Sequence, residues 1–435
     1  MTSSENKQEL FLSSFFSVLD VDSETETLKK SRMKTWNRFL DIRPLTDKEE
    51  NFKYVPLKEI TSKNYEKATH AKITSDLVKS LVLPECQNSF IVFINGFYNK
   101  ELSDTSNHGS SFVLLPFKDA MKTYNTLLTN NTQRLIKDEK DPFVLLTASC
   151  YQDGAFFYLP PNIELTQPIQ IINIHSENTQ TWVMPRFFFF CGTNSHVTLI
   201  NTSHYESSKE ELVSVLYEYN LEEQSSVKLV DFDLEKHPES GWNFSAFRIF
   251  QKKNSVFKAT QVQNSSKTRR DWKITLLGEN ANCALNGIWL LKSSNEGHTN
   301  VVIEHTEPYC ESLQYFKGVL DDSAHSSFQG KIIVQKKAQK TQAYQLNNNL
   351  LLSSKAQSFS KPGLEIFADD VKASHGSTTG NIDQEQLFYL RTRGFSEQEA
   401  RNCLLSGFCF DIFATLPTPS LINKAKNYIL RFRNT

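Results

Sequence analysis

One segment of this 435-residue chain gathers residue types that could do chemistry. It runs from Phe367 to Gly380, FADDVKASHGSTTG, and holds two adjacent carboxylates, Asp369 and Asp370, and one histidine, His375. A neutral imidazole is a good ligand for iron or zinc, and the small residues around it leave room for a close approach. A lone histidine is more often only a hydrogen-bonding group, so both interpretations stay open from the residues alone. We expect this segment to join the last strand of the preceding region to the first helix of the tail.

Several classes of enzyme are excluded by missing motifs. The 15 glycines include no GxG pair, which removes the dinucleotide fingerprint and the kinase phosphate loop. Gly330-Lys331 is the only Gly-Lys pair, and it lacks the rest of a Walker A loop. HExxH and GxSxG are also absent, and the seven cysteines are scattered without a CxxC pair. The chain therefore carries no familiar nucleotide-binding loop, zinc knuckle or cysteine cradle for a cluster.

The charge balance and hydropathy indicate which partners to expect. There are 48 basic and 49 acidic residues, with no block of like charges, so we expect no nucleic-acid partner. The longest strongly apolar stretch, around Phe187–Cys191, is far too short to span a bilayer, so we expect no membrane partner. The first residues, MTSSENKQEL, do not resemble a secretory signal, and we expect a cytoplasmic protein.

The chain divides into three regions. Residues 1–142 are expected to be mostly helical, with an extended segment at Phe90–Phe97 and a polar linker at 129–141. Residues 143–372 alternate short β-branched and aromatic segments with polar spacers, which predicts more than 200 residues of mainly β structure. Residues 373–435 return to a helical pattern.

A repeat in the β region favours a solenoid. Aliphatic pairs at Leu276-Leu277, Val319-Leu320 and Leu351-Leu352 are each followed by a spacer of nine or ten residues and a glycine. An alanine lies at the fourth position of each spacer: Ala281, Ala324 and Ala356. Equal spacing of apolar positions is typical of a parallel β-helix whose turns stack. A β-sandwich whose hairpins share a spacing is the alternative, although the spacers lack the Asn-Gly and Asp-Gly turns that tight hairpins prefer. The one Asn-Gly pair in the repeats, Asn286-Gly287, falls at the end of its spacer.

The tail predicts three helices. Asn381 or Asp383 can cap the first, and Ser396 with Glu399 forms a capping box for the second. The last is expected from about Ser420 to Leu430, after Pro417 and Pro419. From the residues alone, the arginines of these helices belong to a solvated face.

The tail also carries a family signature. The stretch FADDVKASHGSTTGNIDQEQLFYLRTRGFSEQEARNCLLSGF resembles the C-terminal signature of the SufB/SufD family, the scaffold subunits of the SUF iron–sulfur cluster assembly machinery. Further matching motifs occur in the family's order, and strong matching covers roughly residues 265–415. The matching motifs in this range are Arg270-Asp271, Leu277-Gly278-Glu279, Tyr315-Phe-Lys-Gly-Val-Leu320, Gly330-Lys331, Ala338-Gln339-Lys340-Thr341 and Asn349-Leu350-Leu351-Leu352-Ser353. Before it the resemblance is patchy: Asn51-Phe52-Lys53-Tyr54 resembles the family's aromatic N-terminal motif, with Phe where Trp is common. The chain is short and poor in cysteine, and its histidine lies where SufD-like members place theirs, so it is most similar to the SufD side of the family.

The resemblance implies a fold and an assembly. It implies a right-handed parallel β-helix core flanked by N-terminal and C-terminal helical regions. It also implies a non-catalytic scaffold that pairs edge to edge with SufB, with SufC ATPases docking on the C-terminal helices and remodelling the interface. Alone, the chain is expected to form a homodimer through the same edge. The docking surface so implied comprises Leu387, Phe388, Leu390, Arg391, Arg393, Arg401, Leu404 and Phe408.

The resemblance further implies that His375 helps to ligate a transient iron–sulfur cluster at the SufB–SufD interface. Many SufD chains have a cysteine two positions earlier, where this chain has Ala373, so ligation by this subunit would rest on His375 alone. Asp369, Asp370 and Lys372 match the motif but are expected to close the last turn of the coil. Whether the complex also binds a flavin is left open.

Two alternatives remain. A SufB-like subunit that has lost its cysteines would share the fold. A β-helix enzyme acting on polysaccharide would need clustered acidic residues in a groove on the coil. No acidic cluster recurs on successive repeats, which disfavours the enzyme.

Overall fold

The computed structural model describes residues 11–12, 14–15, 26–42, 50–176, 179–206, 210–234, 241–264 and 266–432. Helical spacing of apolar residues predicts a pair of helices in the first 45 residues, closed by Pro44. Of that pattern, Leu10, Val18, Leu19 and Pro44 lie outside the described part, whereas Phe11 and Phe15 are helical and buried. No helix in the described part is both long and apolar enough to cross a bilayer.

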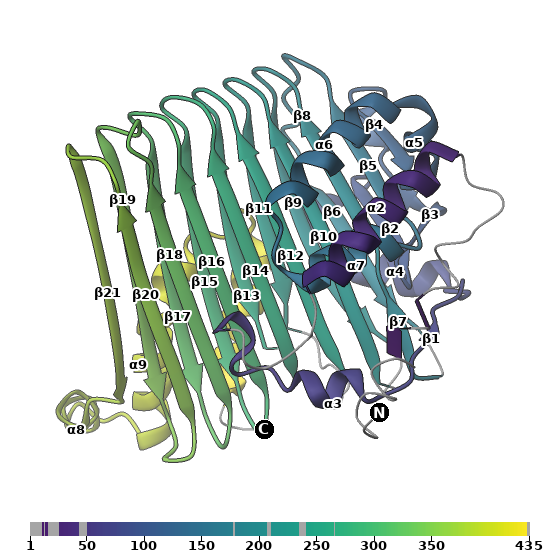
Figure 1. Ribbon diagram of the computed structural model, residues 1–435. Helices are drawn as coiled ribbons and strands as arrows, with labels where there is room; N and C mark the ends of the chain where they lie inside the picture. Colours follow the sequence, from purple (N-terminus) through teal and green to yellow (C-terminus); the bar gives the residue numbers. More distant parts are fainter. Residues whose placement is uncertain are drawn as a thin grey trace, which may run out of the picture.

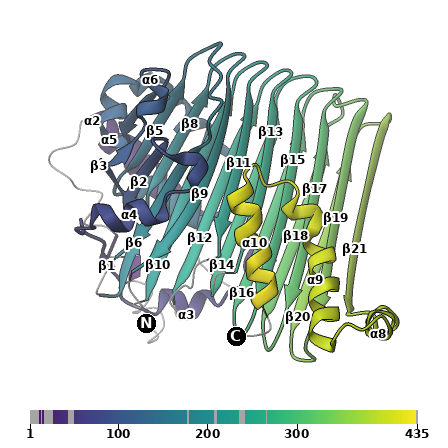
Figure 2. The ribbon, with the colours of Figure 1, turned by 180° about the vertical axis from the view of Figure 1, so that it is seen from behind.

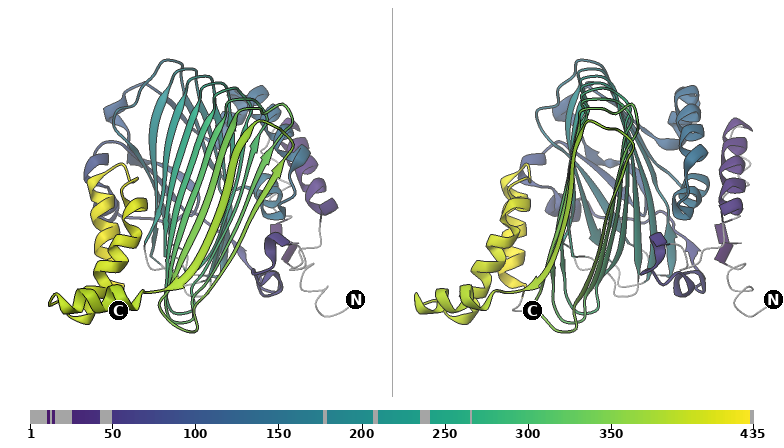
Figure 3. Two further views of the ribbon diagram at one scale, coloured as in Figure 1. Left: turned by 90° about the vertical axis from the view of Figure 1, so that its left-hand side faces the viewer. Right: turned by 60° about the vertical axis from the view of Figure 1, so that its left-hand side comes forward.

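The core of the chain is a flattened parallel β-solenoid built from two facing sheets (Figures 1 and 3). Along sheet A the main order is β20-β18-β16-β14-β12-β10-β8-β5-β4, with β1 and β7 beside it. Along sheet B the order is β21-β19-β17-β15-β13-β11-β9-β6-β2-β3. Successive turns therefore place alternate strands in the two sheets, and the sandwich alternative is wrong because neighbouring strands of the coil run parallel.

The strands of sheet A are β1 (Glu66–Lys67), β4 (Val113–Pro116), β5 (Gly154–Leu159), β7 (Thr181–Val183), β8 (Arg186–Cys191), β10 (Glu211–Leu221), β12 (Trp242–Gln251), β14 (Lys267–Leu276), β16 (Glu296–His305), β18 (His325–Val334) and β20 (Gln357–Ile366). Those of sheet B are β2 (Phe90–Ile94), β3 (Phe97–Asp104), β6 (Ile169–His175), β9 (His196–Tyr205), β11 (Ser226–Asp233), β13 (Val256–Gln263), β15 (Asn282–Leu291), β17 (Glu311–Leu320), β19 (Thr341–Leu351) and β21 (Val371–Asn381).

Helices cover the two outer faces of the solenoid. α2 (Glu26–Ile42), α6 (Asn125–Asp138) and α7 (Pro142–Cys150) lie over sheet A, as Figure 1 shows, with α3 (Leu57–Thr61), α4 (Ser75–Leu81) and α5 (Phe117–Thr123) in the same half of the chain. On the opposite side, α9 (Glu397–Phe413) and α10 (Pro419–Arg431) lie over sheet B (Figure 2). α8 (Gln384–Thr392) projects beyond the last strand (Figures 2 and 3).

The solenoid interior is held together by stacked side chains from equivalent positions. The rings of Phe187, Tyr217, Phe247 and Trp272 form one column through four turns, with neighbouring centroids 5.0, 4.9 and 3.8 Å apart. Each strand contributes an inward residue every second position, so one turn repeats the pattern of the turn before it. The resulting column buries large aromatic rings in every turn. Burial of apolar surface is the dominant favourable term in the free energy of folding.

The repeat seen in the sequence has a simple explanation. The spacers with Ala324 and Ala356 occupy the same corner of successive turns, ahead of β18 and β20, whereas the spacer with Ala281 occupies the opposite corner, ahead of β15. One turn takes about 30 residues, since Thr341 pairs with Val371. In the sequence, Gly287 and Gly330 are 43 residues apart and Gly330 and Gly363 are 33 apart, which suggests that degenerate turns intervene. That interpretation is wrong, because 43 residues are about one and a half turns.

Three expected boundaries shift. Strands β2, β3 and β4 belong to the sheets although they lie within 1–142, and the expected linker at 129–141 is largely helix α6. The expected end of the coil at 372 falls inside β21, which runs to Asn381. The segment from 371 to 380 is therefore the last strand itself and not a connection after it.

A glycine inside the coil provides a test of this packing. A Cβ at Gly330 would overlap the amide of Gln345, which is buried in the interior, whereas a Cβ at Gly363 would meet nothing closer than 3.6 Å. We expect Gly330→Ala to lower the free energy of unfolding by about 1–3 kcal/mol through overpacking. The matched variant Gly363→Ala should change it by less than about 0.5 kcal/mol. Urea unfolding followed by circular dichroism measures both, and equal effects would show that the interior is not packed as described.

Candidate functional site

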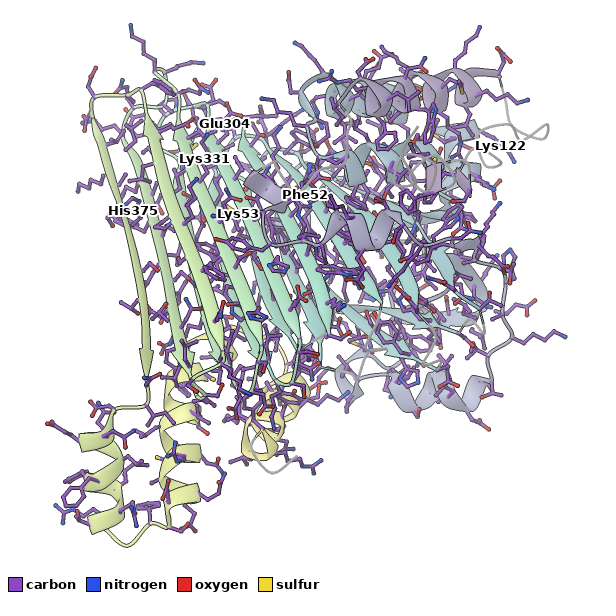
Figure 4. All side chains as sticks on the ribbon, turned by 60° about the horizontal axis from the view of Figure 1, so that its bottom comes forward. Phe52, Lys53, Lys122, Glu304, Lys331 and His375 are labelled. Carbon is purple, nitrogen blue, oxygen red and sulfur yellow. The ribbon has the colours of Figure 1, made fainter. Side chains whose placement is uncertain are left out.

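His375 lies in the middle of β21, the last strand of sheet B (Figure 4). One edge of β21 pairs with β19, where His375 is in register with Gln345. In the described part of the chain, no strand pairs with the other edge of β21, nor with the other edge of β20 in sheet A. Both edges therefore present backbone donors and acceptors that another strand could use.

The side chain of His375 belongs to an inward-facing column. Leu285, Gln314, Gln345 and His375 are successive partners in the register of sheet B. Ala373, two positions earlier on the same side of β21, packs into an apolar cluster inside the coil. Since side chains of a strand alternate between faces, His375 faces the same side as Ala373, toward the open end of the last turn.

This column changes from apolar to polar near the open end. Leu285 is buried and apolar, whereas the next two positions are buried glutamines, with the Gln345 side-chain amide donating to the Gln314 Oε1 at 2.7 Å. The Gln345 Oε1 and the Gln314 Nε2 are buried and have no hydrogen-bond partner within the described residues. His375 is the exposed end of a polar stack in the coil.

The carboxylates of the same segment have another role. Lys340 and Asp370 form an ion pair between neighbouring corners, and the Asp370 backbone N–H donates to the Gln339 side chain at 2.9 Å. The hydrogen bond that the Lys340 ammonium donates to Asp370 raises the pKa of Lys340, which keeps the ammonium charged. Asp370 therefore ties the last turn to the preceding one, in agreement with the structural role expected for it, while Asp369 and Lys372 are exposed.

The donor set around His375 is small. Its nearest chain neighbours are Ser374 and Gly376, and Ala373 offers no ligand. Across the described ranges, no group of three or more histidine, cysteine, aspartate or glutamate side chains could hold a metal ion. His375 contributes one imidazole with either ring nitrogen as a donor.

The last turn also exposes apolar side chains that earlier turns bury. Ile366 in β20 pairs in register with Val334, which is fully buried, yet Ile366 itself is 38% exposed. Phe367, the next residue, is 59% exposed. The open end of the coil therefore combines free strand edges, exposed apolar groups and one imidazole.

The tail helices separate the candidate docking residues into two groups. Leu387 is buried with Ile382 and Ala400, and Leu390 and Leu404 pack against that cluster. These three leucines hold α8 against α9, as a helix pair requires.

The other candidates include the exposed residues of α8. Phe388 is 70% exposed, and Arg391 and Arg393 are also exposed, the latter with its guanidinium 5.1 Å from the ring centre of Tyr389. Arg401 of α9 pairs with Glu397 at 2.9 Å. Phe408 faces the solenoid, where its ring lies 4.8 Å from the Lys317 ammonium. The capping box at Ser396 and Glu399 and the Asp383 cap are confirmed.

Comparison with known families matches both halves of the chain. Residues 173–408 match the model of the SUF system FeS cluster assembly SufBD core domain, and residues 1–171 match that of the SufBD protein N-terminal region. This chain belongs to the SufBD family. The match to the core domain alone covers more than half of the sequence.

Named relatives place this SufBD chain on the SufD side. An iron-sulfur cluster assembly SufBD family protein of Synechocystis is 28% identical over 400 residues, covering 88% of this chain and 86% of its own length. The iron-sulfur cluster assembly protein SufD of Escherichia coli is 35% identical over 162 residues, or 37% of this chain and 38% of that protein. SufD of Bacillus subtilis is 27% identical over 301 residues, covering 65% of this chain and 64% of that protein.

Arg270 and Asp271, one of the motifs found in the sequence, each form a buried ion pair. Arg270 faces into the coil, where its Nε donates to Asp231 at 2.9 Å. Asp271 faces outward and meets the guanidinium of Arg248 at 2.7 Å. Burial opposes its ionisation, but Arg248 and Arg269 outweigh burial and lower the pKa of Asp271.

Sequence analysis missed the other members of this outward cluster. Glu139 lies 2.7 Å from Arg248, and Asp141 lies 2.6 Å from Arg269, so the end of α6 and the start of α7 are tied to sheet A by ion pairs. A signal was present, because Glu139 and Asp141 fall in the polar stretch that was expected to be a linker. Lys317 belongs to the motif Tyr315–Leu320, but sequence analysis did not find its partner Asp411, with which it joins β17 to α9 at 3.0 Å.

The position of His375 predicts that it contributes little to folding of this SufBD chain. His375→Ala should change the free energy of unfolding by less than about 0.5 kcal/mol, because the side chain is exposed. Gln345→Ala, one turn further inside, should cost about 1–3 kcal/mol because it leaves the buried Gln314 oxygen without its donor. Urea unfolding of the two variants is the measurement. A large loss for His375→Ala would instead make the histidine a structural residue.

Proposed function

We propose that this chain is a non-catalytic, SufD-like subunit of a SUF iron–sulfur cluster assembly complex in the cytoplasm. It pairs through β20 and β21 with a SufB-like paralogue, and its C-terminal helices bind a SufC-type ATPase. The family match and the SufD-named relatives support the assembly role. The sequence carries no phosphate-binding loop, so ATP-driven work is assigned to the partner.

The observation that carries the proposal is the place of His375 on an uncapped last turn. Free edges of β20 and β21 suit strand pairing with a second solenoid, and Ile366 and Phe367 offer apolar surface for the same contact. When a SufB-like chain is absent, a second copy of this chain takes the edge, giving a homodimer. Pairing across these edges brings His375 to the interface between the two coils.

The chemistry of the site suits a cluster that must leave. The iron–sulfur cluster is the cargo, and His375 supplies one nitrogen to it. An imidazole is neutral and binds iron less tightly than a thiolate does, so a cluster held partly by His375 is more readily released. Because this chain offers one donor, we assign the remaining ligands to the paralogue across the interface.

The role of His375 is testable in the assembled complex. When this chain is co-expressed with SufB- and SufC-type partners, His375→Ala should leave co-purification unchanged while the iron and sulfide bound per complex fall several-fold. Lys372→Ala is the matched control, since Lys372 is exposed on the same strand three positions away. Undiminished iron and sulfide in the His375→Ala complex would contradict a ligand role.

The ATPase-docking role is testable separately. Arg391→Glu reverses the charge of an exposed α8 arginine and should weaken co-purification of the SufC-type partner without weakening that of the SufB-like partner. A charge reversal in the rim of an interface acts mainly through electrostatic complementarity, so the loss should grow smaller at high salt. Lys426→Glu on the exposed side of α10 is the control. Equal retention of the ATPase by both variants would place its docking surface elsewhere.

A further inference from the structure

The C-terminal helices rest on sheet B through a broad apolar contact. Buried aliphatic residues of the outer face of the sheet meet buried residues of α9 and α10. The two helices lie in front of the strands in the view of Figure 2. The sheet side comprises Ile200, Val230, Val262, Ile288, Leu290 and Val319, and the helix side includes Leu405, Cys409, Ile412, Leu421, Ala425 and Ile429. Apolar contact is non-directional, so by itself it does not fix where along the sheet a helix sits.

One cation interrupts this apolar contact. Lys317 lies on β17, and its side chain is only 5% exposed. Its ammonium donates to the backbone carbonyl oxygen of Phe408 at 2.6 Å and to the carboxylate of Asp411 at 3.0 Å. The ring of Phe408 lies 4.8 Å from the same ammonium, which adds a cation–π contact.

A second donor from β17 reaches the same carboxylate. The Tyr315 hydroxyl donates to the Asp411 Oδ2 at 3.1 Å, so one oxygen of α9 accepts from two side chains of a single strand. Burial disfavours the charged form of Lys317, yet hydrogen bonds to Tyr315 and Asp411 outweigh burial and raise its pKa. The hydrogen bond from Lys317 lowers the pKa of Asp411, so both partners stay ionised near neutral pH.

An ion pair at this position is not the simplest way to gain stability. Removing an ammonium from water costs free energy that a close carboxylate and a carbonyl only offset, and an apolar residue of similar size often serves as well. The ion pair adds geometric specificity, because its hydrogen bonds have preferred directions and so fix the position of α9 along β17. Thr260 and Thr415, whose hydroxyls lie 2.7 Å apart, add a weaker polar contact nearer the end of α9.

The position of the pair links two parts of the molecule. β17 is two strands from the open edge in the order β21-β19-β17, and β21 leads through Ile382 directly into α8. α8 and the start of α9 project beyond the sheet, whereas the second half of α9 is fixed to β17 (Figures 1 and 2). When α8 and the start of α9 are displaced, the attachment of α9 to β17 transfers the force to β17 and to its neighbours β19 and β21.

We propose that Lys317 and Asp411 form the coupling that transmits movement of the C-terminal helices to the last turns of the solenoid. This inference rests on the proposed function, in which an ATPase acts on those helices and the cargo forms at β21. Lys317 and Asp411 are positioning residues, which touch neither nucleotide nor cluster. Without this ion pair the apolar contact still keeps α9 on the sheet. The helix then slides along the sheet when the ATPase pulls on it, and the strands do not move with it.

The test compares two lysines that each pair with a carboxylate. Lys317→Met removes the ammonium and keeps most of the apolar volume of the side chain. Asp411→Asn removes the carboxylate charge that α9 contributes to the pair. Lys331→Met is the matched control, because Lys331 lies on a solenoid strand and pairs with Glu365 of the next turn, remote from the tail helices (Figure 4). Each variant is co-expressed with the SufB- and SufC-type partners, and ATP hydrolysis and bound iron and sulfide are measured on the purified complex.

We expect Lys317→Met and Asp411→Asn to retain the ATPase and its hydrolysis rate, while iron and sulfide loaded per ATP hydrolysed fall about three- to tenfold. Hydrogen exchange gives a readout that a merely structural role would not move. In the unmodified complex, ATP should alter hydrogen exchange in β17, β19 and β21. In the Lys317→Met complex, the ATP-dependent change in exchange should be confined to α8 and α9. Lys331→Met should behave as the unmodified chain.

Unchanged loading per ATP in both variants, with unchanged ATP-dependent exchange in β17, would overturn the coupling while leaving the proposed function intact. Failure of the unmodified chain to retain an ATPase would instead overturn the proposed function. If Lys317→Met does not fold, Asp411→Asn decides alone, because the Asp411 side chain is 58% exposed and its replacement leaves the apolar contact in place.

Discussion

Parallel pairing between successive turns is the interaction on which the rest of this structure depends. Each strand of the coil satisfies its backbone groups only through the turn before and the turn after it, so the stack must end in a strand with one unpaired edge. At one end the sheets finish in the antiparallel strands β3 and β4. At the other end, β20 and β21 finish the sheets with no further strand from the described part of the chain.

That asymmetry accounts for what is found at the last turn. Val334 is fully buried by the turn that follows it, while Ile366, its equivalent one turn later, is left partly exposed. The same step carries the inward column from the buried Gln345 to the exposed His375. A position that is buried in the preceding turn is thereby exposed at the surface of the last turn, without a loop or a separate domain to present it. Only two residues separate the end of β21 from α8, so the strand that carries His375 leads directly into the tail helices.

Much of this fold could be predicted from the sequence. Alternating apolar residues identified the strands, the recurring alanine corners identified a solenoid, and cap residues such as Asp383 and Ser396 placed the tail helices. The phase of the repeat could not be predicted, because both corners of a turn use similar spacers and sequence does not show in which sheet a strand lies. Nor could the strand nature of 371–381 be predicted, since its small and polar residues resemble a loop when no following turn covers them.

The residues that act at a distance were harder to find. Lys317 and Asp411 are 94 positions apart, and neither belongs to a local pattern that marks a buried pair. The family resemblance implied that Phe408 is a docking residue, yet in the structure its ring faces Lys317. The candidate histidine stood out in the sequence among small residues, but its proposed role as a ligand came from the family resemblance.

Pulsed electron paramagnetic resonance on the assembled complex tests the central claim most directly. With ¹⁵N-histidine incorporated only in this chain and the bound cluster reduced to a paramagnetic state, the account predicts a strong hyperfine coupling from one directly bound nitrogen. That coupling should vanish when His375 is replaced by alanine. A cluster that shows no coupling to nitrogen from this chain, or a coupling that survives the replacement, would contradict the claim that the last turn of the solenoid supplies a ligand to the cargo.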